Sequence, residues 1–166
     1  MTTNLKIDGL EKLKAALAAL APELRNGPAR KALRAGAKPV LVRAKAETPI
    51  LSADIYRHGK MIRKAGTLRR ALRIRSSKDV NRTGDVGVFV NYKPLTRGAI
   101  SDFKQSTGRR GADNPNDPFY WRWVHFKTRR NHNPKPALTI AGEAVLQSES
   151  LPIITEHLKR HFAAKG

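Results

Sequence analysis

Leucines recur at helical spacing near the start of the chain. They occupy positions 10, 13, 17, 20 and 24, which lie on one face of a helix from about residue 9 to about residue 25. Asp8 and Glu11 stand at the beginning of this stretch with the spacing of a capping box. The pattern therefore predicts an amphipathic first helix.

A second helix is predicted from about residue 28 to about residue 47. Pro28 opens it, since proline is well tolerated in the first turn of a helix. Pro39 lies inside it, and because proline removes a helical hydrogen bond, we expect a kink or a local break there. Its inner face consists of Ala29, Leu33, Ala37, Val40 or Leu41, and Ala44.

Alternating valines indicate strands in the middle of the chain. Val86, Val88 and Val90 alternate with residues that face the other way, and Ile74 belongs to an apolar stretch before them. The spacing predicts two antiparallel strands, joined through a polar turn at about residues 77–84.

Residues 119–126 are rich in aromatic side chains and predict a further strand. We expect one face of this strand to lie in the core and the other to be a subunit interface, since large aromatic side chains suit a contact between proteins. The alternative is a platform on which single-stranded nucleic acid stacks its bases. The predicted interface residues are Trp121, Trp123 and His125, and the opposite face carries Tyr120, Arg122, Val124 and Phe126.

Two stretches lack a clear hydrophobic pattern. Residues 50–65 carry many cations, which indicates an irregular segment or a short surface helix. Residues 93–118 contain several glycines and prolines, and a loop of this length is usually functional or disordered. We expect a single domain over residues 1–166, with 51–65 as a basic insert and 93–118 as a long loop.

The last part of the chain returns to helical spacing, with helices predicted over residues 137–145 and 153–162. The order helix, helix, strands, helix predicts an α+β fold. In this fold, two N-terminal helices and a C-terminal helix pack on a small, mainly antiparallel β-sheet with long loops.

The net charge of the chain indicates what kind of partner it binds. The chain has 33 Lys and Arg against 13 Asp and Glu, a formal net charge of +20, and such an excess repels itself unless a polyanion or an acidic partner neutralises part of it. No acid occurs between Asp54 and Asp79, or between Asp117 and Glu143. The alternative is a solvated basic face. We expect polyanion contact from the cations Arg57, Lys60, Arg63, Lys64, Arg69, Arg70, Arg73, Arg75, Arg129 and Arg130.

Recognised catalytic motifs are missing from the sequence. It has no cysteine, phosphate-binding loop, nucleophile elbow or zinc-binding HExxH helix. Asn131-His132-Asn133, near His125, could serve a metal-dependent nuclease, but its Asn and Pro neighbours favour a turn. We therefore expect no enzyme activity, metal or cofactor. We also expect no membrane span and no signal peptide, since no apolar stretch is long enough.

Five short motifs follow one another along most of the chain. They are Ile7-Asp8-Gly9-Leu10, Ala46-Glu47-Thr48-Pro49, Gly66-Thr67-Leu68-Arg69-Arg70-Ala71-Leu72, Val124-His125-Phe126-Lys127-Thr128 and Pro134-Lys135-Pro136-Ala137-Leu138. In this order they resemble the tail-completion, or head-tail joining, proteins of long-tailed bacteriophages. The chain departs from the family pattern in four places. His125 stands where the family usually has an acid, Lys127 replaces a glycine, residues 51–65 are inserted, and the loop at about 93–118 is longer than a minimal member needs.

The resemblance implies a structural protein of the virion. It would be one subunit of a homo-oligomeric, hexameric ring in the phage neck, between the head connector and the tail tube, made in the host cytoplasm. Its partners would be other copies of itself, the head-connector and tail proteins, and the genomic double-stranded DNA that passes through the channel. No membrane partner is implied.

Two other functions remain as alternatives. One is a small basic ribonuclease that cuts RNA without a metal, as some bacterial toxins do. The other is a free nucleic-acid-binding module. The charge also leaves open whether the cations face DNA or acidic surfaces of neighbouring subunits, because either would neutralise them.

Overall fold

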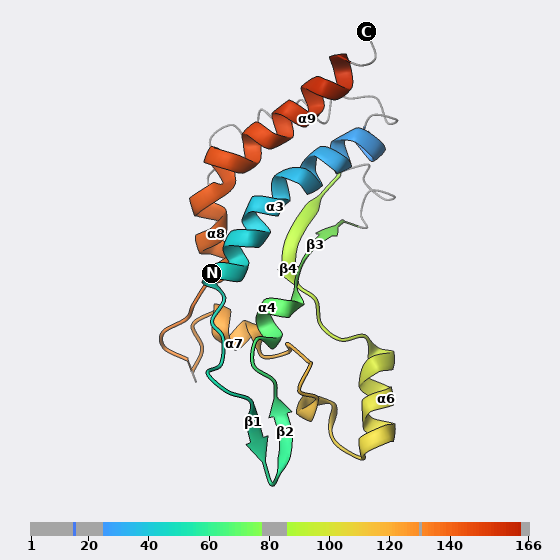
Figure 1. The fold of residues 1–166 in the computed structure, drawn as a ribbon, viewed down its shortest axis with the longest axis vertical. Coiled ribbons are helices and arrows are strands. Elements are labelled where there is room, and N and C mark those ends of the chain that lie inside the picture. Colours follow the sequence, from blue (N-terminus) through green and yellow to red (C-terminus); the bar gives the residue numbers. More distant parts are fainter. Residues whose placement is uncertain (1–14, 16–24, 78–85, 130, 164–166) are drawn as a thin grey trace. The chain divides into compact units, whose positions relative to one another are not determined.

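A computed structural model describes residues 15, 25–77, 86–129 and 131–163 (Figure 1). Its contacts group the chain into two compact units. The first contains the described parts of residues 1–44, 74–90 and 138–166, and the second contains those of 45–73 and 91–137. The predicted first helix, apart from Ala15 and Arg25, and its capping box lie outside the described residues. We predicted a single domain, meaning that the chain folds as one cooperative unit, and this stays a prediction.

Helices form most of the first unit. They are the π-helical turn η1 (Arg25–Ala29), α3 (Arg30–Glu47), α8 (Ala137–Val145), the π-helical turn η3 (Leu146–Ser150) and α9 (Leu151–Ala163). The predicted second helix and both predicted C-terminal helices are therefore confirmed. No helix in the described parts of the chain is long and apolar enough to cross a membrane.

Helix α3 runs through Pro39 without interruption, so the expected local break is wrong. Gly36 and Val40 are buried on either side of the proline, and this packing holds the helix together despite the missing hydrogen bond. The inner face is confirmed at Ala29, Val40 and Ala44, which are buried. Leu33, Ala37 and Leu41 are only half-buried.

Gly36 of α3 closely approaches α9, and the two helices lie side by side in Figure 1. A methyl group at Gly36 would lie 2.9 Å from the carbonyl oxygen of Ser150 and closer still to the side chain of Ile154. Ile154 is itself buried. Glycine is therefore required here by the short distance between the helices.

Strands β3 (Leu72–Ser76) and β4 (Val88–Tyr92) form a two-stranded sheet. The Ser77 N–H donates to the Gly87 carbonyl at 2.7 Å, and the Lys93 N–H donates to the Ala71 carbonyl at 2.8 Å. The start of one strand thus meets the end of the other, which confirms the antiparallel pair. Most of the predicted turn lies outside the described residues. A short helix that the sequence did not predict, α4 (Thr67–Ala71), precedes β3.

The basic insert is a β-hairpin, so the prediction of an irregular segment or a short helix is wrong. Strand β1 (Ile55–Arg57) pairs antiparallel with β2 (Lys60–Arg63). His58 and Gly59 connect them with φ of 50° and 70°. Two consecutive positive φ angles match a type I′ turn, whose twist suits a two-residue hairpin loop.

The predicted long loop contains helix α6 (Arg97–Thr107) and the 3₁₀ turn η2 (Gly111–Asp113). The Thr96 hydroxyl accepts a hydrogen bond from the Ala99 N–H at 3.2 Å, and Gly108 ends the helix with a φ of 64°. Threonine is a common N-cap residue and glycine a common C-cap residue. The prediction of a loop is therefore wrong for residues 97–107, which form a capped helix.

The predicted aromatic strand is also wrong, because Trp121–His125 form helix α7. The Trp121 N–H donates to the Pro118 carbonyl at 2.9 Å and begins the turn. A helical turn places Trp121 and His125 on the same face, and the Trp121 ring stacks on Tyr92 with centroids 5.3 Å apart. Packing on Tyr92 outweighs the strand propensity of these aromatic residues. The α+β fold class itself is confirmed.

Candidate polyanion-binding surface

The second unit carries most of the predicted contact cations. Arg75 belongs to the first unit, and Arg130 lies outside the described residues. Arg63 is half-buried. The exposed predicted cations of the second unit are Arg57, Lys60, Lys64, Arg69, Arg70, Arg73 and Arg129.

Arg63 is engaged inside its own unit. Its guanidinium carbon lies 4.6 Å from the centroid of the Phe119 ring and 5.3 Å from that of Tyr120. Its Nη1 donates to the Ala112 carbonyl at 2.8 Å. These contacts join β2 to the segment around η2. Arg63 therefore has a structural role that the sequence did not indicate.

Arg109 makes the reciprocal connection, from the segment before η2 to the hairpin. Its Nη2 donates to the Met61 carbonyl at 2.8 Å and to the Asp113 carbonyl at 3.0 Å. Its guanidinium carbon lies 5.4 Å from the centroid of the Phe103 ring. The basic insert and the segment after β4 are thus tied together by two arginines.

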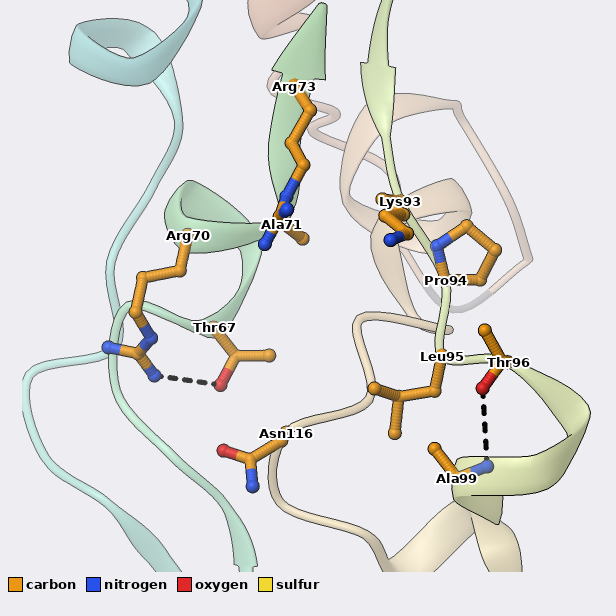
Figure 2. A pocket seen from close by; sticks show the side chains of 10 residues that line it. All are labelled: Thr67, Arg70, Ala71, Arg73, Lys93, Pro94, Leu95, Thr96, Ala99 and Asn116. Atoms are coloured by element: carbon orange, nitrogen blue, oxygen red, sulfur yellow. Dashed lines mark hydrogen bonds between the residues drawn. The ribbon is translucent and has the colours of Figure 1, made fainter. Parts of the chain in front are cut away.

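A pocket of about 240 Å³ gathers three further cations in the second unit. Arg70 comes from α4, Arg73 from β3 and Lys93 from the chain just after β4. Figure 2 shows their cationic groups bordering one space together with the side chain of Asn116. The other lining residues are Thr67, Ala71, Pro94, Leu95, Thr96 and Ala99.

Hydrogen bonds fix the wall of this pocket that α4 provides. Nη2 of Arg70 donates to the Thr67 hydroxyl at 3.2 Å. That hydroxyl lies 2.8 Å from the Lys64 carbonyl and 3.0 Å from the Pro115 carbonyl, to either of which it can donate. Thr67 is 3% exposed. A buried threonine therefore orients an exposed arginine and links it to the chain beside Asn116.

Lys93, Thr67 and Asn116 were not among the predicted contact residues. Lys93 meets Arg73 because β3 and β4 are antiparallel, with the Lys93 N–H bonded to the Ala71 carbonyl. The predicted strand pair could have pointed to Lys93, had its register been known. Asn116 follows a segment that was predicted to be a loop, and no sequence signal places it at the pocket.

The three predicted interface residues have different surroundings in the second unit. His125 is 7% exposed, its Nδ1 has no hydrogen-bond partner among the described residues, and burial lowers its pKa. Trp121 is half-buried on Tyr92. Trp123 is 45% exposed and meets Phe119 edge to face at 5.5 Å. Their interface role stays a prediction, and Trp123 offers the largest exposed surface.

The Asn131-His132-Asn133 segment forms a turn, as predicted. The side-chain amide of Asn131 donates to the Trp123 carbonyl at 2.8 Å, and its backbone pairs with that of Thr128. His132 is exposed. Within the residues that the structure describes, no three His, Asp or Glu side chains gather as a metal site would require.

Asp117 is a buried carboxylate a few residues before α7. It is 6% exposed, and its Oδ1 accepts a hydrogen bond from the Phe119 N–H at 3.1 Å. Burial raises its pKa, while that hydrogen bond and the nearby Arg63 act in the opposite direction. The carboxylate shapes the entry to α7.

Comparison with known proteins gives one family. Residues 11–126 match the model of the HK97-gp10-like family, described as "Bacteriophage HK97-gp10, putative tail-component". No curated protein and no solved structure matches the chain. The matched range includes the hairpin, the cationic pocket and α7.

Proposed function

The chain belongs to the HK97-gp10-like family of bacteriophage tail components, and on this premise we propose that it is a structural subunit of the phage neck. It forms a ring, hexameric in the virion, that joins the head connector to the tail around the DNA exit channel. The proposed role involves no catalytic step, cofactor or membrane.

The family match carries this proposal. It spans residues 11–126, which include all of the second unit except residues 127–137. The family match indicates a tail component. The more specific proposal of a ring in the neck comes from the sequence motifs that resemble tail-completion proteins. A ring component binds its neighbours through extended surfaces. When the same contact repeats from one subunit to the next, the subunits close into a ring if the rotation between them completes a circle.

The basic surface supports a position beside DNA. The net charge of +20 favours contact with a polyanion, and a ring around DNA needs contacts that do not depend on sequence. Arg57, Lys60, Arg69 and Arg129 are exposed in the second unit and suit such contacts. The exposed indole of Trp123 and the half-exposed Phe126 ring suit a contact between subunits.

Native mass spectrometry of the purified protein, with and without tails, tests the ring. We expect closed oligomers in the free protein or on the tail end. Trp123→Ser should shift the equilibrium toward monomers. Phe89→Ser should not, although Phe89 is a somewhat more exposed aromatic residue of the first unit. A particle that is monomeric both in solution and on tails would contradict the proposal.

A further inference from the structure

The cationic pocket of the second unit has the composition of a site for one compact anion. Its cations come from α4 (Arg70), from β3 three residues later (Arg73) and from the chain after β4 (Lys93), as Figure 2 shows. Within the described parts of the chain, none of the three pairs with a carboxylate. Three like charges around one space repel each other, and an anion between them removes this repulsion.

We propose that this pocket binds a single phosphate group of the DNA backbone. The source of the phosphate rests on the proposed function, which places DNA beside the protein. The binding chemistry does not, because it follows from the residues of the pocket alone.

The hydrogen-bond donors of the pocket match a tetrahedral anion with several acceptor oxygens. Arg70 uses one N–H on Thr67 and keeps the others. Arg73 has a full guanidinium fork, and Lys93 offers three N–H donors. The Asn116 amide adds neutral donors. The two non-bridging oxygens of a backbone phosphate can each accept more than one hydrogen bond, so they can use several of these donors at once.

The pocket is also held in place before any ligand binds. The Lys93 N–H bond to the Ala71 carbonyl, at 2.8 Å, joins the chain just after β4 to helix α4, which carries Arg70. Thr67, through its contacts with Arg70 and Pro115, fixes α4 against the chain that leads to Asn116. A site whose walls are already ordered loses less conformational entropy on binding.

The pocket volume of about 240 Å³ fits this reading. It holds a phosphate together with water or with part of the attached sugar, but not a base pair. The contact therefore does not depend on the base sequence. Phosphate contacts generally fix the position of a protein on DNA without selecting a particular site. Such a contact lets DNA of any sequence pass.

The salt dependence of DNA binding separates a shared pocket from three independent cations. The probe is a short fluorescent duplex, followed by anisotropy over a range of salt concentrations. The pocket variant combines Arg70→Gln, Arg73→Gln and Lys93→Gln. The control variant combines Lys31→Gln, Lys38→Gln and Lys159→Gln, which removes the same charge from exposed positions of the first unit.

A pocket that neutralises one phosphate predicts a small change in slope. The slope of log K against log salt should fall by about 0.9 in the pocket variant, the value for one phosphate. Its affinity should fall at least about tenfold because three charged donors are lost together. Three separate contacts would lower the slope by roughly 2.7, three times as much, and would overturn the pocket. An equal loss in the control variant would overturn it too.

Titration with inorganic phosphate, followed by NMR shifts of backbone amides, tests the ligand group directly. We expect saturable shifts at Ala71, Lys93 and Asn116 in the wild type and none in the pocket variant. Acetate that saturates equally well would assign the pocket to a carboxylate of a neighbouring protein and overturn the proposal. Phosphate binding without any effect on the duplex would exclude DNA as its source. The ring is tested without DNA, so failure of one proposal leaves the other standing.

Discussion

The guanidinium carbon of Arg63 lies 4.6 Å from the centroid of the Phe119 ring, and the same side chain donates to the Ala112 carbonyl. A cation in the basic insert thus stabilises the fold across more than forty residues of sequence. Arg109 makes the matching contact with the Met61 carbonyl. Not every cation of this chain is available to a polyanion.

Replacing Arg63 should cost stability. Arg63→Gln loses the cation–π contact and the hydrogen bond to Ala112, and we expect the free energy of unfolding to fall by about 1–2 kcal/mol. Urea denaturation measures this change. Arg57→Gln removes the same charge from an exposed position of the same hairpin and should change stability by less than about 0.5 kcal/mol. Equal effects of the two variants would show that Arg63 is a surface cation only.

Two glycines of the first unit should respond in opposite ways to alanine. A methyl group at Gly36 would overlap Ile154 and approach Ser150, so Gly36→Ala should destabilise the protein by about 1–3 kcal/mol. At Gly142, inside α8, a methyl group meets nothing within 4 Å. Gly142→Ala should therefore stabilise the protein by up to about 1 kcal/mol through helix propensity. Thermal unfolding compares them, and a stable Gly36→Ala protein would refute the close approach of α3 and α9.

Stability should fall in mild acid because of His125. Burial lowers the pKa of this imidazole below its ordinary 6.5, so the unfolded chain binds a proton that the folded chain resists. The free energy of unfolding should decrease as the pH falls through about 6.5 toward the lowered value. His125→Gln should flatten this part of the profile, measured by denaturation between about pH 7 and about pH 5. His132→Gln, at an exposed histidine, serves as the control for the loss of an imidazole.

The two compact units should unfold together. Strands β3 and β4 each contribute residues to both units, so the sheet that they form belongs to neither unit alone. Both tryptophans, Trp121 and Trp123, lie in the second unit, whereas the long helices α3 and α9 lie wholly or mostly in the first. Tryptophan fluorescence and far-ultraviolet circular dichroism should therefore give the same urea midpoint. Two distinct midpoints would show two folding units in place of the single predicted domain.

Regular hydrophobic spacing made several elements predictable. The helices around Val40 and Ile154 and the strand at Val88 and Val90 carry a repeat that burial on one face enforces. The hairpin was missed although His58-Gly59 is a short turn signal, because its strands have hardly any buried side chains to set an alternating pattern. Its order comes from contacts such as that of Arg109 with Met61, which only the folded chain reveals.

The aromatic segment and the cationic pocket show a different limit. Trp121 prefers strands as an isolated residue, but stacking on Tyr92 selects a helical turn. The charge-rich stretch pointed to Arg70 and Arg73 as anion contacts, whereas Lys93 joins them only through the register of β3 and β4. The sequence could indicate that arginines contact an anion, but which cations line one pocket depends on the pairing of the strands.

Immunogold electron microscopy of purified virions that carry an epitope-tagged copy of this protein tests the neck assignment most directly. The proposal predicts gold at the junction of head and tail, on virions with attached tails. Gold along the tail tube or at its distal tip, or virions without the protein, would contradict it.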